Sequence, residues 1–271
     1  MSQSLQVINH GSFLNCHSLR CIKLPESLQK IEDCSFEGCC SLQSTLNIPN
    51  SVISIGRNAF ARCKGLQSVT LPQSFEIINY GTFANCNSLQ NILLPESLLE
   101  IGDCSFDCCI SIQHLIIPDN VTRIGIAAFN FCTNLRSVNL PQSLQRIGRS
   151  AFNACSSLQH IESPDSLQDI EELSFQYCSS LRSIDIPNLV TRIERGTFHY
   201  CNQLQSVTLS QSLQVISRSA FASCHSLLDI QLPENLQEIE HLSFDGCKSL
   251  RSINIPNSVI RIGREAFRDC V

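Results

Sequence analysis

Apolar residues recur along this chain with a period far longer than that of a helix or a strand. Phenylalanine returns every 23 residues, except for one interval of 24 between Phe36 and Phe60. We call this series the Phe ladder, and its twelve members are Phe13, Phe36, Phe60, Phe83, Phe106, Phe129, Phe152, Phe175, Phe198, Phe221, Phe244 and Phe267. Three residues after each member stands a cysteine, which gives a Cys ladder of twelve members: Cys16, Cys39, Cys63, Cys86, Cys109, Cys132, Cys155, Cys178, Cys201, Cys224, Cys247 and Cys270. Self-similarity at a fixed period indicates a stack of repeated structural units.

The repeated unit reads P-x-x-L-x-x-I-x-x-x-x-F-x-x-C-x-x-L-x-x-I-x-L. All ten prolines fall at its first position, and Ser210 replaces proline once inside the chain. Eleven full units cover residues 2–255 and a partial unit covers 256–271, about 11.5 repeats of 23 residues. One unit alone cannot bury its Leu, Ile, Phe and Cys side chains, whereas stacked units form a continuous core. No linker interrupts the pattern, so we predict a single solenoid domain over residues 1–271.

A second rhythm of 69 residues lies above the first. The residue after the proline position is acidic in one class of unit, at Glu26, Glu96, Asp165 and Glu234. It is Asn or Asp in the next class, at Asn50, Asp119, Asn188 and Asn257. It is Gln in the third class, at Gln3, Gln73, Gln142 and Gln211. This order indicates growth by duplication of blocks of three units.

Each unit predicts two short extended segments and a helical turn. In residues 66–71 apolar and polar residues alternate toward the end, which favours a strand. The following proline ends this strand because proline has no N–H to donate to a neighbouring strand. Residues 144–148 favour a second extended piece that ends at a glycine turn. Residues 149–155, R-S-A-F-N-A-C, fit one or two turns of 3₁₀ or α-helix. The predicted fold class is therefore an α/β repeat, a solenoid of parallel strands with short helical or 3₁₀ turns, roughly 55 Å long at ~4.8 Å per strand.

The string L-x-x-I-x-L-P-x-x-L-x-x-I-G-x-x-A-F-x-x-C resembles the BspA-like subclass of leucine-rich repeats. Residues 141–155, PQSLQRIGRSAFNAC, are its cleanest instance, and the resemblance covers essentially the whole chain. It implies a right-handed leucine-rich-repeat solenoid of a kind found in surface and secreted proteins of bacteria and protists, often proposed as adhesins. Those relatives usually carry export or anchoring segments, and polar capping units are normally expected at the ends of a solenoid, so a piece of a longer protein is a second interpretation.

The localisation stays open on the sequence. The first residues, MSQSLQVINHGSF, lack a basic segment followed by an apolar one, so no secretory signal is visible. No apolar run approaches the ~20 residues that span a bilayer, and we expect no membrane-spanning segment. The resemblance suggests the cell surface, whereas a ladder of free thiols suits a reducing compartment.

The densest cysteine cluster is C-S-F-D-C-C at residues 104–109. Cys109 belongs to the Cys ladder, and Cys104 occupies a position where other units have Cys34 or Leu173. A position that accepts either Leu or Cys favours packing, since free cysteine behaves as a small apolar residue. A local metal site and scattered disulfides remain alternatives, but Cys34 and Cys104 lie three rungs apart, ~14 Å, too far to share an ion.

Composition and motifs exclude several classes of function. Apolar residues make up 43% of the chain, charged residues 16%, and the net charge is −5 with both signs interspersed, which argues against nucleic acid as a partner. No phosphate-binding, nucleophile-elbow or zinc-protease motif occurs, and no histidine and acid stand ready to activate a serine. We therefore predict a non-enzymatic protein without cofactor or metal that binds a protein partner. The alternative is an adhesive or structural segment of a longer cell-surface protein.

The partner site is expected on the strand that precedes each proline. Its outward positions are mostly small and polar, but Leu93 and Ile116 are apolar at the same phase of adjacent units. Around them the predicted binding surface includes His114, Asn139, His160 and Glu162. Local packing variation, or a cover formed by another part of the same chain, is the plainer interpretation. A second candidate is the aromatic column of Phe131, Tyr177 and Tyr200, two residues after members of the Phe ladder, which is equally able to shield the turn between rungs.

Overall fold

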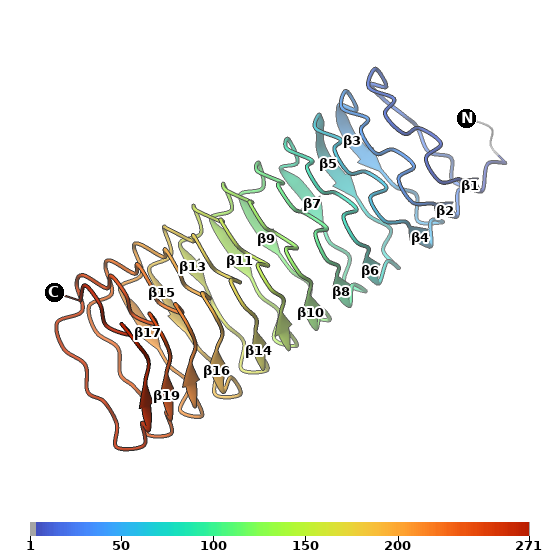
Figure 1. The fold of residues 1–271 in the computed structure, drawn as a ribbon. Helices are drawn as coiled ribbons and strands as arrows, with labels where there is room; N and C mark the ends of the chain where they lie inside the picture. Colours follow the sequence, from blue (N-terminus) through green and yellow to red (C-terminus); the bar gives the residue numbers. More distant parts are fainter. Residues whose placement is uncertain (1–3, 271) are drawn as a thin grey trace.

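The computed structural model, in which residues 4–270 are described, is a β-solenoid of about eleven turns with one unit per turn (Figure 1). Two rows of short strands run along it. The pre-proline strands, which lie before the proline position, are β3 (Ser44–Asn47), β5 (Leu66–Thr70), β7 (Asn91–Leu93), β9 (His114–Ile116), β11 (Ser137–Asn139), β13 (His160–Ile161), β15 (Ser183–Asp185) and β17 (Ser206–Thr208). The post-proline strands are β1 (Val7–Ile8), β2 (Lys30–Ile31), β4 (Ser54–Ile55), β6 (Ile77–Ile78), β8 (Glu100–Ile101), β10 (Arg123–Ile124), β12 (Arg146–Ile147), β14 (Asp169–Ile170), β16 (Arg192–Ile193), β18 (Val215–Ile216), β19 (Glu238–Ile239) and β20 (Arg261–Ile262).

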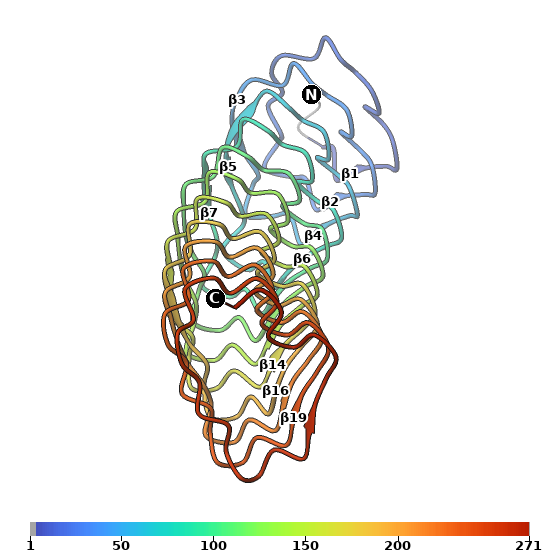
Figure 2. The ribbon, with the colours of Figure 1, turned by 60° about the vertical axis from the view of Figure 1, so that its left-hand side comes forward.

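All strand pairs are parallel, as expected when equivalent segments of successive units stack. The pre-proline strands form three sheets, β3-β5-β7, β9-β11-β13 and β15-β17. The post-proline strands form β1-β2-β4, β6-β8-β10-β12-β14 and β16-β18-β19-β20. Seen closer to end-on, the turns superpose as elongated loops around a common interior (Figure 2).

The single 24-residue interval is absorbed in a pre-proline strand. The register of β3 against β5 shifts between Ser44 and Thr45: Ser44 pairs with Leu66 and Thr45 pairs with Ser68, so Gln67 of β5 is left without a partner residue across the sheet. A bulge adds one residue to one strand and leaves the pairing on either side intact. The Phe ladder therefore stays in register through the longer unit.

The turn that contains the ladder phenylalanine is not helical, and the predicted helix over residues 149–155 is wrong. No residue of the described range 4–270 lies in a helix. Ser150 and Ala154, two residues before and after Phe152, have φ of 56° and 58°, and every unit repeats these two left-handed positions. L-residues adopt this conformation singly and not in helices, so the segment bends at each of them.

Hydrogen bonds in this turn alternate between two directions. The Phe152 N–H donates to the Ser174 carbonyl of the next unit at 2.8 Å, and the Ala154 N–H donates to the Gln176 carbonyl at 2.7 Å. The intervening Asn153 N–H donates back to the Ser150 carbonyl at 3.1 Å. An α-helix needs every N–H for its own segment, whereas here alternate N–H groups join one unit to the next.

The Phe ladder is a continuous stack of rings. Neighbouring ring centroids lie 4.9–5.8 Å apart with planes within 13° of parallel. The ten members from Phe36 to Phe244 are buried, which confirms the predicted core positions. Phe13 and Phe267, at the two ends, are only partly buried. The strand spacing of ~4.8 Å is close to this stacking distance, so backbone and rings repeat together.

The Cys ladder packs beside the rings, and its thiol groups also donate hydrogen bonds to backbone carbonyls. The Cys155 Sγ donates to the Phe129 carbonyl of the preceding unit at 3.2 Å, and the Cys178 Sγ repeats this contact with Phe152. Such a bond is present for all members from Cys39 to Cys270. Cysteine suits this position because it is small, apolar and still able to donate a weak hydrogen bond.

Burial changes the acidity of these thiols. It raises the pKa of Cys39 to about 11 and of Cys86 to about 12, and it raises the pKa of Cys155 well above its ordinary value. The folded state therefore holds thiol protons that the unfolded chain loses near pH 8.5. At higher pH the cysteines of the unfolded chain ionise while the buried thiols of the folded protein stay protonated, which favours unfolding. The stability that these buried thiols contribute is therefore complete below about pH 8 and declines as the pH rises.

Phe152→Ala should lower the free energy of unfolding by about 3–5 kcal/mol, because it leaves a cavity in the middle of the ring stack. Phe131→Ala is the matched control, since Phe131 is exposed and lies outside the Phe ladder. Urea unfolding followed by circular dichroism measures both. A loss below about 1 kcal/mol for Phe152→Ala would contradict the stacked register.

The free energy of unfolding should fall with rising pH between pH 9 and 10, by up to about 1.4 kcal/mol per pH unit for each buried thiol. Cys155→Ala should reduce this slope by one such step. Leu158→Ala, which alters a buried neighbour without a titrating group, should keep the wild-type slope. Urea titrations across this pH range in reductant test the prediction, and equal slopes for all three proteins would refute it.

Candidate partner-binding surface

Leu93 and Ile116 are the most exposed apolar side chains on the pre-proline strands, with 67% and 75% of their surface accessible. Each ends its strand, β7 or β9, and points away from the core because the buried residue is its neighbour. Thr70 pairs with Leu93 and Asn139 pairs with Ile116. The two residues thus stand at equivalent positions of successive units, among polar neighbours.

The polar residues predicted for this surface lie on the same sheet as Ile116. Ser137 of β11 pairs with His114 on one side and His160 on the other. The His114 Nδ1 lies 2.8 Å from the Ser137 Oγ, which fixes that ring over the strand. Glu162 follows β13 directly and is exposed. Across the stacked strands, one row of equivalent positions therefore carries the imidazoles of His114 and His160. The row two residues later in each unit carries Ile116, Asn139 and Glu162.

A break in the hydrogen-bonded sheet separates Leu93 from Ile116. β7 ends one pre-proline sheet and β9 begins the next. Beside this break lies a polar cavity of about 220 Å³ lined by Gln90, Asn91, Ser111, Gln113 and His114. The break was not predictable from the repeat pattern, because β7 and β9 follow it equally well.

The post-proline face carries a second apolar group, which sequence reasoning missed. Ile53, Ile77 and Leu99 are exposed in three successive units, and Ile53 has 65% of its surface accessible. Ile53, Phe75 and Ile77 help to line a cavity of about 440 Å³. Their positions, four or five residues after the proline, are polar in most units and would have revealed them.

The same face is charged toward the C-terminal end. Arg123 contacts Glu100 and lies 3.1 Å from Asp103, and Arg146 lies 3.0 Å from Asp169. These side chains are roughly one-third to one-half exposed, so each pair contributes ~0–1 kcal/mol. Along the post-proline face, the apolar group of Ile53, Ile77 and Leu99 is therefore followed by ion pairs, and exposed apolar residues return at Ile260 and Ile262, which are 79% and 50% accessible.

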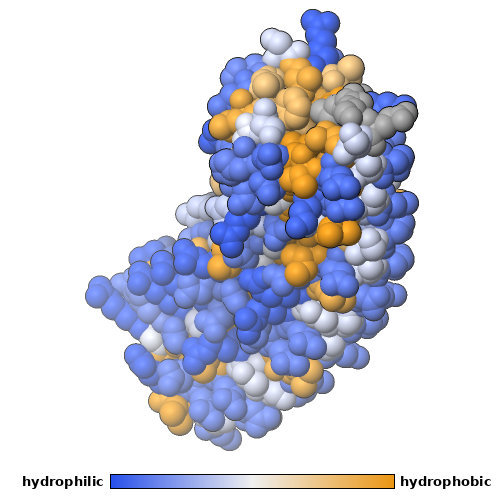
Figure 3. All heavy atoms as spheres, turned by 90° about the vertical axis from the view of Figure 1, so that its right-hand side faces the viewer, coloured by the Kyte–Doolittle hydropathy of each residue, from blue (hydrophilic) through white to orange (hydrophobic). Residues whose placement is uncertain are grey.

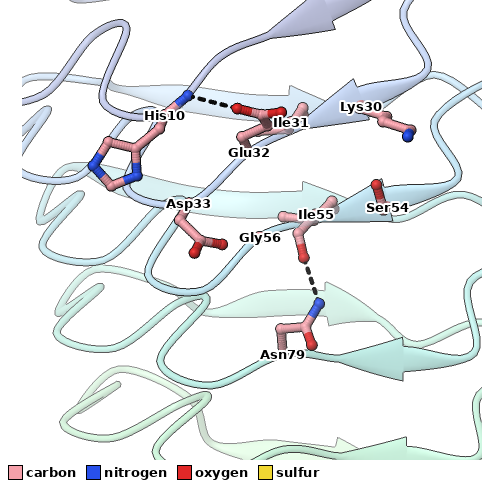
Figure 4. A pocket seen from close by; sticks show the side chains of 9 residues that line it. All are labelled: His10, Lys30, Ile31, Glu32, Asp33, Ser54, Ile55, Gly56 and Asn79. Carbon is pink, nitrogen blue, oxygen red and sulfur yellow. Dashed lines mark hydrogen bonds between the residues drawn. The ribbon is translucent and has the colours of Figure 1, made fainter.

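A hollow of about 360 Å³ opens on the post-proline face near the first units (Figure 4). The His10 N–H donates to Glu32 Oε2 at 3.0 Å, and the Asn79 side-chain amide donates to the Ile55 carbonyl at 2.6 Å. Gly56 forms its floor, since a Cβ there would lie 2.4 Å from Asp33. Each of these two bonds joins a side chain of one unit to a backbone group of the preceding unit. Among residues 4–270, no group of three His, Cys, Asp or Glu side chains is arranged to hold a metal ion.

The aromatic column forms a stacked pair at the edge of the turn. The Tyr177 and Tyr200 rings are 4.8 Å apart and 6° from parallel, and the His199 ring lies 4.2 Å from Tyr200. Burial lowers the pKa of His199, and the Gln176 side-chain amide lies 3.2 Å from its Nδ1. Phe131 lies two units before Tyr177 and is exposed, with no ring contact to that pair among the described residues.

The cysteines of the C-S-F-D-C-C cluster occupy structural positions of the turn. Cys104 and Cys108 occupy the two left-handed positions around Phe106, and Cys109 is buried in the Cys ladder. Desolvation raises the pKa of Cys104 and raises that of Cys108 to about 11, with Asp107 adding to the second effect. A thiol held protonated at neutral pH is a poor nucleophile and a poor metal ligand.

The repeat geometry and the sequence agree with one family. A family model described as the BspA type leucine rich repeat region matches residues 1–79, 53–181 and 146–271, in six copies. The chain belongs to the BspA-type leucine-rich repeat family. Repeats of this family and solenoids of this fold are generally non-catalytic and are typical of surface or protein-interaction proteins.

Solved structures of bacterial proteins share this solenoid. A leucine-rich repeat protein from Bacteroides ovatus is 30% identical, with a TM-score of 0.83 over 100% of this chain and 76% of that one. A leucine rich cell surface protein from Faecalibacterium prausnitzii is 26% identical, with a TM-score of 0.58 over 98% and 80%. The pneumococcal vaccine antigen PcpA, 19% identical, shares the fold with a TM-score of 0.63 over 98% and 72%. Among curated proteins, none matches this chain.

Membrane insertion through a helix has no support in the described chain. None of residues 4–270 belongs to a helix long and apolar enough to cross a bilayer.

In the folded protein, thiol reagents should first modify Cys16 and Cys21, which are exposed, and should leave the ten ladder thiols from Cys39 to Cys247 largely unmodified. Denaturation without reductant should then make more than half of the seventeen cysteines reactive. Timed alkylation with peptide mass spectrometry measures both steps. Mostly unreactive cysteines after denaturation would show a disulfide-linked protein.

Proposed function

We propose that residues 1–271 act as one non-enzymatic scaffold that binds a protein partner on the pre-proline strands. The observation that carries this proposal is the pair of exposed apolar residues, Leu93 and Ile116, at equivalent positions of successive units. Removing exposed apolar side chains such as these from water makes the free energy of partner binding more favourable. A small apolar centre within a polar rim is also the usual composition of a protein interface.

The surrounding residues would give this surface its specificity. His114, Asn139, His160 and Glu162 supply donors and acceptors within two units of the apolar pair, and the cavity beside His114 offers a recess for one side chain. Rim groups of this kind orient a partner, while the buried centre contributes most of the affinity. The partner in this proposal is a folded protein or an extended peptide, not nucleic acid, because the net charge is −5.

The second candidate function is adhesion or surface structure as a segment of a longer protein. It is supported by the similarity to a protein named a leucine rich cell surface protein, which is 26% identical. In that role many weak contacts along the solenoid would act together. An export or anchoring segment in the open reading frame around this sequence would favour this function over the first.

A Leu93→Ser/Ile116→Ser protein should lose most partner recovery in a quantitative pull-down, because the apolar centre of the surface is gone. The matched control is Leu189→Ser/Leu228→Ser, which removes two apolar residues that are each 54% exposed elsewhere. Both variants must unfold cooperatively like the wild type. Equal recovery by all three proteins would place the interface elsewhere, and the column of Tyr177 and Tyr200 would be tested next.

A further inference from the structure

Aromatic residues outside the Phe ladder gather at one exposed position of the unit. The chain has fourteen Phe and three Tyr, and the Phe ladder accounts for twelve of the Phe. Three of the remaining five, Phe131, Tyr177 and Tyr200, form the aromatic column and are 47%, 45% and 37% exposed. Seen from the side of the first units, hydrophobic residues form a band among those units, and hydrophilic residues cover most of the other surface in view (Figure 3). The aromatic column lies in later units and is therefore a separate feature.

The backbone at this position is unfavourable for an aromatic residue. Phe131, Tyr177 and Tyr200 have φ of 55°, 59° and 62°, in the left-handed region. In other units the equivalent position holds residues that adopt positive φ more readily, namely Asn15, Gly38, Asn85 and Gly246. A bulky residue in this conformation is strained, and such strain gathers at positions with a function. The turn itself therefore does not explain why these three residues are aromatic.

The aromatic column is interrupted at Ala154. This residue occupies the equivalent position in the unit between Phe131 and Tyr177, with φ of 58°. Phe131, Ala154 and Tyr177 each donate their N–H to a carbonyl of the next unit, over 2.8, 2.7 and 2.9 Å. The same backbone conformation and the same bond direct their Cβ atoms alike. A methyl group therefore stands where the units on either side carry rings, and Ala154 is only partly buried.

The spacing across Ala154 fits one further ring. Two rungs separate Phe131 from Tyr177, about 10 Å at the strand spacing. Aromatic rings stack with their centroids about 4.5–7 Å apart, so a ring midway between the two lies within stacking distance of both. The chain shows this arrangement one unit further on, where the Tyr200 ring stacks on Tyr177 at 4.8 Å and 6° from parallel.

The polar side chains beside Ala154 are engaged along their own rows. The Asn153 side-chain amide donates to the Asn130 Oδ1 at 2.8 Å, and the Ser156 Oγ donates to the Thr133 carbonyl at 3.4 Å. A ring placed over Ala154 meets two aromatic rings and a methyl group. This setting suits an aromatic side chain better than a sugar, because buried hydroxyl groups need hydrogen-bond partners.

We propose that Phe131, Ala154 and Tyr177 form a binding site for one aromatic side chain of a polypeptide partner. The incoming ring lies over the Ala154 methyl group, with the Phe131 ring on one face and the Tyr177 ring on the other. Binding extends the aromatic column to four consecutive rings, from Phe131 to Tyr200. The site lies on the turn and not on the pre-proline strands, so this inference and the proposed partner surface can fail separately.

The test uses the tripeptide N-acetyl-Gly-Trp-Gly-amide as the probe, because the protein has no tryptophan and the indole fluorescence belongs to the probe alone. Its fluorescence anisotropy should rise to saturation as the protein is added. Phe131→Ala and Tyr177→Ala each remove one stacking face and should raise the dissociation constant about 2- to 10-fold. Ala154→Tyr fills the place with a ring of the chain itself and should abolish binding. Tyr80→Ala is the matched control, since Tyr80 is 48% exposed and lies outside the aromatic column, and it should bind like the wild type.

Nuclear magnetic resonance of isotope-labelled alanine methyl groups locates the site in the wild type. The Ala154 methyl signal should move upfield as the tripeptide is added, because ring faces shield the protons above them. Absence of saturable binding, or binding unchanged in Ala154→Tyr, would overturn the proposal. Equal binding of N-acetyl-Gly-Leu-Gly-amide, or a shift of the Ala154 signal by methyl glucoside and not by the tripeptide, would overturn it as well.

Urea unfolding checks the fold of each variant. Ala154→Tyr should unfold like the wild type, because Tyr177 and Tyr200 stand at the equivalent position of other units. If it is unfolded, Phe131→Ala and Tyr177→Ala decide the question, since both remove exposed side chains. Wild-type affinity in both of these would also overturn the proposal.

Discussion

The hydrogen bond from each ladder phenylalanine between Phe13 and Phe244 to the carbonyl of the next unit sets the geometry of this molecule. It holds successive turns at a spacing at which aromatic rings also stack, so the Phe152 and Phe175 rings lie 5.5 Å apart. Pairing and packing then favour the same register. This explains why the strands themselves can be as short as two residues: the turn, and not the sheet, supplies much of the connection between units.

The fold could be read from the sequence because its long-range contacts are periodic. The spacing of Phe and Cys placed Phe152 and Cys155 in the core, and both are buried. The helix over residues 149–155 was wrong because the two left-handed positions hold ordinary residues such as Ser150 and Ala154. Glycine, which adopts this conformation readily, stands at five of the equivalent positions in other units, Gly11, Gly38, Gly81, Gly196 and Gly246, and was the available sign of them. At the positions without glycine, the bonds between units impose the conformation.

The candidate surface was only partly predictable for a related reason. The positions of Leu93 and Ile116 within the unit correctly predicted that both are exposed, since outward and inward residues alternate along a strand. The break between β7 and β9 depends on small differences in pairing between units that share one pattern. Ile53 and Ile77 lie on the post-proline face, outside the strand on which the partner site was predicted. Whether a partner binds any of these surfaces is a property of the partner's chemistry as well.

The bulge between Ser44 and Thr45 has a consequence for how such proteins change length. The longer unit is accommodated in this segment before the proline, while its turn keeps the hydrogen bond from the Phe36 N–H to the Ala59 carbonyl and the stacked Phe36 and Phe60 rings. Loop variation is tolerated where it leaves buried backbone pairing untouched. The pre-proline segment is therefore where peptides, tags or reporter loops can be grafted into this scaffold, and where natural variants of unequal unit length would diverge without disturbing the stack.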